Sequence, residues 1–396
     1  MKSILFIHQG TGIGGASLCL NELLNEIKTE YDITVLCIYQ SDAVDYFRSN
    51  GFKTDVLDSF FYRKIYKYFY HSEASYYTLL TPIAFSRAVI SYIINLYLAK
   101  EIIKKYNPSL IHLNSSVLTD WAIVAKKNGY KVVIHVREPI SKGYFGIRIQ
   151  LIRFVIKKYT DHVVAISYDN ANRLGLLFKT TIIYDTIRNL PFEIKNKTDQ
   201  NISYFTYFGG SMAIKGFHVL AQALKYLDPD IRIYFGGYFY KNNVGVGLIW
   251  KFKHLIKQII PIYIKWFSDI KIVEKSEKII EIGVVDNVYE YISKSRALLF
   301  PSTKPHFSIP VLEAYKIGIP VIVSDVEGMN EIVDNNTGIF FKKNNSKSLA
   351  NAINYMAKMD NNQYDKYSAN CLRKLEEIND NNKNNKIKDV FKRLLK

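Results

Sequence analysis

The hydrophobic positions of this chain form short continuous runs, separated by longer stretches with helix-like spacing. In the first half the runs are Ile4–Ile7, Ile33–Tyr39, Leu110–Leu113, Val132–Val136, Val163–Ile166 and Thr181–Ile183. In the second half they are Ser203–Phe208, Ile231–Phe235, Ile279–Ile282, Ala297–Phe300, Val321–Val323 and Gly338–Phe341. Apolar runs separated by helical lengths are typical of parallel strands buried on both faces. The pattern predicts two doubly wound α/β domains in series.

A polar stretch, Pro191–Asn201, predicts where the two domains meet. We expect a first domain over residues 1–190 and a second over 200–378. Apolar residues at helical spacing from Ile387 to Leu395 predict a last helix that packs back on the first domain. Ligands of such sheets bind beyond the carboxyl ends of the strands, which places a site in a cleft between the domains if those edges face each other.

Composition narrows the classes of protein and partner. Of 396 residues, 48% are hydrophobic and 22% charged, which describes a globular protein, and the net charge of +17 favours an anionic partner. Cys19, Cys37 and Cys371 lack metal-ligand spacing, which predicts reduced, buried thiols. The N-terminus runs into a strand without a cleavage signal, so we expect a cytoplasmic location.

One segment, Ala74–Ala99, has Arg87 as its only charge and is long enough to span a membrane. Pro82 and Arg87 lie near its middle, where both are costly in a bilayer. We therefore favour a buried or interfacial helix beyond Pro82 over a membrane span.

A glycine motif, Gly10-x-Gly12-x-x-Gly15, follows the first apolar run. Its spacing fits a dinucleotide site or a turn that serves another phosphate. A nicotinamide site also needs an acid at the tip of the second strand, and the candidate, Asp42, sits late. The alternative of a nicotinamide oxidoreductase is therefore disfavoured.

The segment Ala297–Val333 carries the most informative chemistry. A strand leads into a proline-rich loop and then a short helix, Pro310–Ile317, with Pro310 at its first position. The amides of Phe307 to Ile309 can receive an anion or a sugar hydroxyl, and Glu313 beside them can accept hydrogen bonds from a ribose diol. Alternatively, Glu313 only complements the helix dipole.

A second glycine turn, from Gly209 and Gly210 to Lys215, follows the strand Ser203–Phe208. Two glycines and a lysine suit a diphosphate, although the spacing is not that of a Walker loop. The alternative is an isolated surface lysine.

Together these motifs resemble the group 1 (family 4) retaining glycosyltransferases of GT-B fold, in which two Rossmann-like domains face a cleft. The resemblance rests on Gly14-Gly15-Ala16, "IHLNSS", "AISYDNANRL", "IIYDTI", "GGSMAIKG", "IGVVDNVYEYI", Ala297–Val333 and "EIVDNNTGIFF". It implies transfer of a sugar with retention from a nucleotide-sugar, a UDP-sugar being favoured over a GDP-sugar, to a glycan or lipid-linked glycan of the cell surface.

The resemblance also implies roles for single residues. Glu313 matches the glutamate that binds the donor ribose, and Lys215, with Gly209 and Gly210, matches the turn that holds the diphosphate. Gly15, with Gly14, matches the turn that closes the diphosphate side from the first domain. The remaining donor-binding matches are the backbone at Val285 for the base and the segment Phe307, Ser308 and Ile309 for phosphate and sugar.

Three departures from the family pattern concern the sugar and the diphosphate. Pro305 replaces a glutamate eight residues before Glu313, and His306 is the candidate to replace its contact. Gly210 stands where an arginine is common. At the end of the strand Val132–Val136, Arg137 falls on the family's histidine position; we expect Arg137 and Glu138 to line the cleft, and His135 is either on the acceptor side or a core histidine.

The implied mechanism needs no cofactor. Glu313, Lys215 and Arg137 are the catalytic candidates, and lysine and backbone amides stabilise the leaving diphosphate. No Asp-x-Asp motif lies near these loops, so no metal is expected. A catalytically silent binding protein of the same fold is the further alternative, because of Pro305 and Gly210.

Three stretches combine cations with aromatic residues: Phe60–Tyr70, Ile147–Tyr159 and Ile249–Phe267. Such segments suit an anionic bilayer surface, and in Ile147–Tyr159 we expect Ile147, Leu151, Phe154 and Val155 on one stripe. Nucleic acid is not expected, because no binding module accompanies them. The alternative is that the aromatic residues are core. The first interpretation predicts a peripheral enzyme at the inner face of the cell membrane.

Overall fold

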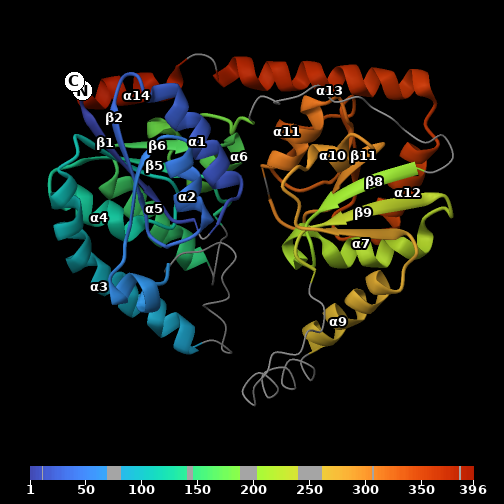
Figure 1. Cartoon of the computed structure of the whole chain (residues 1–396), viewed down its shortest axis with the longest axis horizontal. Helices are drawn as coiled ribbons and strands as arrows, with labels where there is room; N and C mark the ends of the chain where they lie inside the picture. The colour runs from blue at the N-terminus through green and yellow to red at the C-terminus, as the bar shows by residue number, and fades with distance from the viewer. Residues whose placement is uncertain are drawn as a thin grey trace. The chain divides into compact units, whose positions relative to one another are not determined.

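The computed structural model describes residues 1–10, 12–68, 82–140, 146–187, 203–239, 261–305, 307–382 and 385–396. The chain divides into two compact units, which Figure 1 shows as two separate sheets with their helices. Unit 1 consists of Met1–Arg188 with Asn379–Lys396, and unit 2 is Asn189–Ile378. The boundary segment expected at Pro191–Asn201 lies outside the described residues.

Unit 1 is built on a seven-stranded sheet of order β3-β2-β1-β4-β5-β6-β7, with every neighbouring pair parallel. The order reverses at β1, which pairs with both β2 and β4. The strands are β1 (Ser3–His8), β2 (Asp32–Cys37), β3 (Lys53–Val56), β4 (Leu110–Leu113), β5 (Lys131–Val136), β6 (His162–Ala165) and β7 (Thr180–Ile182).

Strand β3 is the one strand of this sheet that the hydrophobic pattern misses. It lies at the edge, and its sequence, Lys53-Thr54-Asp55-Val56, has a single fully buried position at Thr54. An edge strand with an exposed lysine needs no continuous apolar run, so a search for such runs passes over it.

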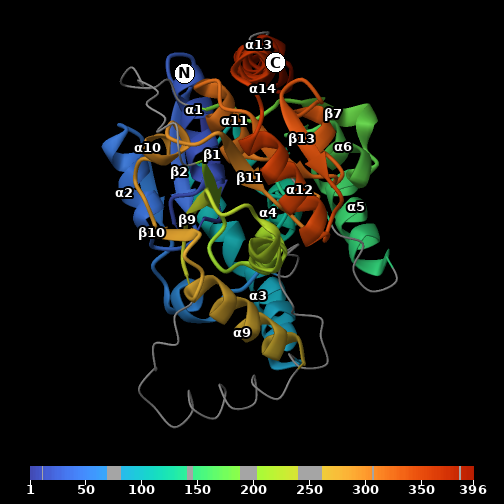
Figure 2. The same cartoon turned by 90° about the vertical axis from the view of Figure 1, so that its right-hand side faces the viewer.

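Helices cover both faces of this sheet (Figures 1 and 2). The core on one face includes residues of α3, α4 and α5, and the core on the other includes residues of α1, α2 and α14. The helices are α1 (Gly15–Ile27), α2 (Asp42–Ser49), α3 (Pro82–Tyr106), α4 (Thr119–Lys127), α5 (Ile147–Tyr159), α6 (Tyr168–Leu174) and α14 (Lys386–Leu395), with the short turns η1 (Phe61–Ile65) and η3 (Leu177–Lys179).

The last helix, α14, belongs to the core of unit 1. Its apolar stripe buries Ile387, Val390 and Phe391. At its surface the ammonium groups of Lys388 and Lys392 lie 2.9 and 3.3 Å from the carboxylate of Glu30, so ion pairs flank the apolar contact.

Unit 2 contains a six-stranded parallel sheet of order β10-β9-β8-β11-β12-β13, which reverses at β8. The strands are β8 (Ser203–Phe208), β9 (Ile231–Gly236), β10 (Ile279–Gly283), β11 (Ala297–Phe300), β12 (Val321–Ser324) and β13 (Gly338–Phe341). The helices and turns are η4 (Ala213–Lys215), α7 (Phe217–Ala223), η5 (Leu224–Tyr226), α9 (Pro261–Glu274), α10 (Tyr289–Ile292), α11 (Ile309–Lys316), η6 (Met329–Glu331), α12 (Ser346–Ala357) and α13 (Asn361–Asn382). Two Rossmann-like parallel sheets confirm the predicted fold class.

The three cysteines are free thiols, and the apolar segment beyond Pro82 is helical. Cys19, Cys37 and Cys371 are buried and form no disulfide, as expected. A helix, α3, runs from Pro82 to Tyr106, and residues 74–81 lie outside the described part of the chain. No described helix is both long and apolar enough to cross a bilayer.

The aromatic, basic stretches have different environments. In the first, Phe61, Tyr62 and Tyr66 are core residues, as the core alternative expects, whereas Phe60 is 66% exposed. Most of Ile249–Phe267 lies outside the described residues, and Trp266 and Phe267 pack against the core of unit 2.

Candidate active site

The glycine motif of unit 1 forms the turn between β1 and α1, at the carboxyl end of the strand where the sheet order reverses. Gly14 is the N-cap of α1, and its carbonyl accepts the amides of Ser17 and Leu18 at 2.9 and 3.0 Å. A Cβ on Gly10 would lie 2.3 Å from Nε2 of His8, so the backbone there requires glycine. The turn therefore sits at the position where doubly wound sheets bind ligands.

Asp42 does not stand at the tip of β2. That strand ends at Cys37, and Asp42 is an exposed residue in the first turn of α2. It does not occupy the position that a nicotinamide site requires of its acid.

A buried imidazole fixes this turn. Nδ1 and Nε2 of His8 lie 3.0 Å from Nδ2 of Asn114 and Oγ of Ser17. Burial, and then the charge of Arg137, lower the pKa of His8 to about 3. Because Arg137 Nε donates to Oδ1 of Asn114, the amide presents its NH₂ to Nδ1, and the imidazole proton is on Nε2, directed at Ser17.

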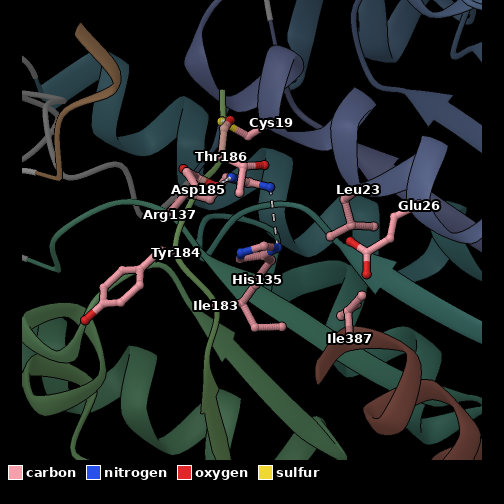
Figure 3. Close-up of a pocket in the computed structure, with 10 residues that line it drawn as sticks. All are labelled: Cys19, Leu23, Glu26, His135, Arg137, Ile183, Tyr184, Asp185, Thr186 and Ile387. Carbon is pink, nitrogen blue, oxygen red and sulfur yellow. Dashed lines mark hydrogen bonds and ion pairs between the residues drawn. The ribbon is translucent and has the colours of Figure 1, made fainter. Parts of the chain in front are cut away.

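Arg137 is buried beneath the carboxyl edge of the sheet (Figure 3). Its guanidinium forms an ion pair with Asp185, donates to Asn114 at 2.9 Å and lies 3.5 Å from Nδ1 of His135. Burial opposes its charge, but Asp185 holds the pKa of Arg137 above its ordinary value. The sequence predicted a side chain that lines a cleft; the structure shows one engaged by three neighbours.

The pocket beside Arg137 is small. It has a volume of about 40 Å³, and its walls include Cys19, Glu26, His135 and Asp185. That volume admits a few water molecules at most, whereas pockets for drug-sized ligands measure roughly 300–1,000 Å³. We therefore assign no nucleotide-sugar to it.

His135 is a core histidine with incomplete hydrogen bonding. It is 1% exposed, and Nε2 has no hydrogen-bond partner within the described residues. Burial holds the pKa of His135 well below its ordinary value, and the positive charge of Arg137 lowers it further. The side chain is therefore a neutral imidazole in the wall of the small pocket.

Glu138 accepts four hydrogen bonds from the ends of neighbouring strands. Oε1 accepts from Oγ of Ser115 at 2.6 Å and from Nε2 of Gln9 at 3.3 Å. Oε2 accepts from the amide and hydroxyl of Ser116 at 3.3 and 3.1 Å. The carboxylate is thus held rigidly beside the β1 and β4 loops.

The glycine turn of unit 2 follows β8, where that sheet reverses. Gly210 has φ +49°, its amide donates to Gly236, and the amide of Ser211 donates to Tyr238. A Cβ on Gly210 would lie 2.2 Å from the carbonyl oxygen of Tyr238. This approach of the β8 and β9 loops explains why glycine replaces the arginine that the resemblance leads one to expect.

We predict that Gly210→Ala lowers the free energy of unfolding by about 2 kcal/mol or more, because the left-handed backbone is strained and the loops must separate. Urea denaturation measures the loss. Gly283→Ala is the matched control, since Gly283 also has positive φ (+68°) but an added Cβ meets nothing within 4 Å. Its expected loss is about 1 kcal/mol. Equal losses would show that the Tyr238 contact is unimportant.

Lys215 ends the turn η4 and lies over the last residue of β11. Its Nζ is 5.2 Å from the ring centroid of Phe300. The loop after β11 is fastened to the same turn, because the amide of Thr303 donates to the carbonyl of Ile214 at 3.0 Å. The loops after β8 and β11 thus form one surface with a cation on it.

Helix α11 starts one residue earlier than predicted, at Ile309, with Pro310 in its first turn. Ser308 is the N-cap, and its Oγ accepts the amide of Val311 at 3.4 Å. This buried hydroxyl fixes the backbone of Phe307 to Ile309 at the start of the helix.

Glu313 is partly buried, and no hydrogen bond or ion pair joins its side chain to another described residue. Burial raises the pKa of Glu313 to about 7. Burial, and then the charge of Glu313, raise the pKa of Tyr289 on α10. The first turn of α11 contains no acid, so Glu313 lies beyond the reach of the dipole interaction that was its alternative role. A desolvated, unpaired carboxylate at a sheet edge indicates a binding function.

The other predicted donor residues lie in loops at the same edge. Val285 is partly exposed after β10, where the carbonyl of Gly283 accepts the amide of Gly237 at 2.7 Å. Phe307 is buried. His306 lies outside the described residues.

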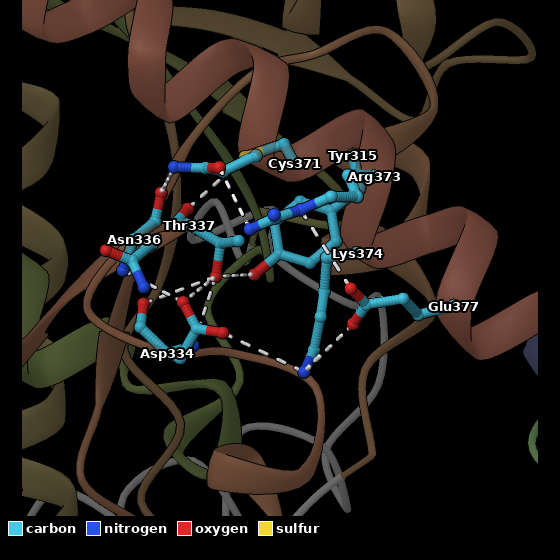
Figure 4. Close-up of polar contacts among 9 residues, drawn as sticks. Tyr315, Asp334, Asn336, Thr337, Cys371, Arg373, Lys374 and Glu377 are labelled. Carbon is cyan, nitrogen blue, oxygen red and sulfur yellow. Dashed lines mark hydrogen bonds and ion pairs between the residues drawn. The ribbon is translucent and has the colours of Figure 1, made fainter.

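The "EIVDNNTGIFF" segment supports α11 (Figure 4). The hydroxyl of Tyr315 on α11 donates to Oγ1 of Thr337 at 2.8 Å, and Sγ of Cys371 on α13 lies 3.4 Å from the Thr337 carbonyl oxygen. Lys374 is 3.8 Å from the carboxylate of Asp334. The motif therefore has a structural role: it joins α11, β13 and α13.

Among the described residues, no group of three or more His, Cys, Asp or Glu side chains is arranged to hold a metal ion. The absence of a cation requirement stays a prediction.

The class of protein follows from the match of residues 191–372 to the family of glycosyl transferases group 1. The matched residues make up most of unit 2, and the glycosyltransferase class predicted from the sequence is confirmed.

The chain is also similar in sequence or in structure to individual glycosyltransferases. It is 22% identical over 275 residues to the O-antigen chain mannosyltransferase RfbU of Salmonella typhimurium, covering 67% of this chain and 70% of that one. The structure of HepE from Anabaena in complex with UDP and glucose aligns over 99% of this chain and all of its own, with TM-score 0.71 and 17% identity. The lipopolysaccharide outer core galactosyltransferase WaaB aligns over 98% and 100%, with TM-score 0.62 and 15% identity. These likenesses establish the GT-B fold.

Proposed function

We propose that this enzyme transfers a sugar, with retention of anomeric configuration, from a nucleotide-sugar to a glycan or lipid-linked glycan in cell-surface polysaccharide biosynthesis. The carrying observation is Glu313 on α11, a carboxylate without a hydrogen-bond or ion-pair partner among the described residues. The loop that leads from β11 into α11 is bonded to the turn that ends at Lys215, because the amide of Thr303 donates to the carbonyl of Ile214. The O-antigen role of RfbU and the UDP and glucose bound by HepE support the proposal, and the latter favours a UDP-sugar over a GDP-sugar.

The unit 2 residues bind the donor in this proposal. Glu313 accepts hydrogen bonds from the ribose hydroxyls, and the backbone at Val285 meets the base. Lys215 and the amides at the starts of η4 and α11 stabilise the charge that develops on the leaving diphosphate. The reaction needs neither a metal nor an organic cofactor.

The unit 1 residues bind the acceptor. Glu138, held by Ser115 and Ser116, orients acceptor hydroxyls in this proposal. Arg137 acts through the geometry it imposes on Asn114 and His135.

Thermal shift with UDP-, GDP- and ADP-sugars tests the donor, because a ligand that binds the folded state raises the melting temperature. Release of nucleoside diphosphate in the presence of acceptor then tests transfer. Binding without release would favour the catalytically silent alternative, and no shift with any nucleotide-sugar would contradict the proposal.

Lys215→Gln is expected to weaken UDP binding about tenfold, because a charge-assisted contact to phosphate is lost. Isothermal titration calorimetry measures this change. Lys225→Gln is the matched control, since Nζ of Lys225 likewise lies over an aromatic ring, 4.9 Å from the centroid of Tyr226. Equal affinities in both variants would remove Lys215 from the diphosphate site.

The acceptor is proposed to be membrane-borne. A lipid-linked glycan confines the reaction to the surface of a bilayer, so the enzyme acts as a peripheral protein at the inner face of the cell membrane. The positive net charge of +17 supports attraction to such a surface.

A further inference from the structure

The outward face of α5 and the neighbouring turn η3 expose large apolar side chains that the proposed reaction does not use. Phe154 is 57% and Phe178 76% exposed. The others on this face, which we call the α5–η3 surface, are Ile147, Leu151 and Leu177. Val155, predicted on the same stripe, is instead buried with Ile152 and Ile156, because the exposed stripe follows the opposite side of the helix.

The two elements form one continuous surface. Nζ of Lys179 in η3 donates to the carbonyls of Ile156 and Lys157, both at 2.9 Å, at the end of α5. Arg153 of α5 donates to the carbonyl of Arg173 at the end of α6, at 2.8 and 3.2 Å. Figure 2 shows α5, α6 and β7 together in unit 1.

A groove runs along this surface. Its volume is about 340 Å³, and its walls include Phe154, Lys157 and Leu176. The wall is thus partly aromatic, partly aliphatic and partly basic. A chain of methylene groups with an anionic end matches this lining.

The surface is also basic. Helix α5 carries Arg148, Arg153, Lys157 and Lys158 and no acidic residue. Nearby acids already have cations of their own: Asp161 pairs with Lys126 at 2.5 Å and Asp169 with Arg173 at 2.7 Å. Nζ of Lys158 lies 5.5 Å from the ring centroid of Phe154, so a cation and an exposed aromatic ring are neighbours on this surface.

We propose that the α5–η3 surface docks the enzyme on an anionic phospholipid bilayer. Aromatic and aliphatic side chains enter the headgroup region, and the lysines meet lipid phosphates. A second copy of the chain fits less well, because a symmetric interface would bring the basic helices of both copies together. The inference deepens the proposed function, on which it rests for the need to reach a lipid-linked acceptor.

Sedimentation of the full chain with vesicles tests the docking. We expect binding to phosphatidylcholine vesicles that contain phosphatidylglycerol, and little binding at high salt or without the anionic lipid. F154S/F178S and K157Q/K158Q should each lower the partition coefficient about tenfold. The matched controls in unit 2, Y355S/L372S and K342Q/K347Q, should bind as the unaltered chain does.

The outcomes separate this inference from the function it rests on. UDP-induced thermal shift should be unchanged in all four variants, so loss of vesicle binding with intact nucleotide binding supports docking alone. Recovery of the unaltered chain in the supernatant at low salt would overturn the inference. Dimers in light scattering that F154S/F178S abolishes, without vesicle binding, would assign the surface to a second copy instead.

Discussion

Glu313→Gln is expected to lower kcat/KM for the donor by about 100-fold, because the amide loses the charge that strengthens two hydrogen bonds to ribose. The same substitution is expected to stabilise the protein above neutral pH. The carboxylate is desolvated and has no hydrogen-bond partner in the described part of the chain, so the folded state gains nothing from its charge.

The sign of the stability effect follows from the pKa of Glu313. Burial raises it from 4.5 to about 7 in the folded state, which therefore binds more protons than the unfolded chain between these values. Stability falls as pH rises through this window, and the whole penalty is present above pH 7. Removing the ionisation should raise the free energy of unfolding by about 3 kcal/mol at pH 8 and by almost nothing at pH 4.

Urea denaturation at both pH values and steady-state kinetics measure the two effects. The unaltered enzyme should bind the donor more tightly as pH rises from 6 to 8, since ribose needs the ionised acid, and the variant should lose this dependence. Glu274→Gln, an exposed glutamate of the same unit, should change neither quantity. An active variant would exclude Glu313 as the ribose ligand, and a variant destabilised at pH 8 would contradict the cost of burying its carboxylate.

The hydrophobic pattern predicts most of the strands but not all of them. A strand buried on both faces must be apolar throughout, so twelve of the thirteen described strands follow from the hydrophobic runs. The hydrophobic pattern misses the edge strand β3, because Lys53 and Asp55 face water or polar neighbours. The start of α11 differs from the prediction by one residue, because the hydroxyl of Ser308 caps the helix and the helix therefore begins at Ile309.

Site residues are predictable where local geometry demands them. Gly209 and Gly210 lie in a strand-to-helix turn, where an added Cβ would come within 2.2 Å of Tyr207 or Tyr238. Contacts between residues far apart in the sequence have no local sequence signal. Asp185 forms an ion pair with Arg137 because β7 and β5 end at the same edge of the sheet. The motifs "IIYDTI" and "IHLNSS" contained Asp185 and Asn114, yet nothing local pairs them with Arg137.

Arg137→Met is expected to lower the free energy of unfolding by about 3–5 kcal/mol, because it leaves the buried Asp185 without its guanidinium. It also removes the donor that fixes the amide of Asn114, and with it the orientation of His8 behind the first glycine turn. Urea denaturation followed by circular dichroism measures this loss.

The double variant Arg137→Met/Asp185→Asn separates a structural from a catalytic role. Without a buried unpaired charge, it should recover most of the stability lost in Arg137→Met, and Asp185→Asn alone should be less stable than the double variant. If Arg137 serves only to compensate the charge of Asp185, activity should return with stability. If stability returns and kcat stays low, activity depends on the guanidinium itself, as expected if it positions Asn114 and His135.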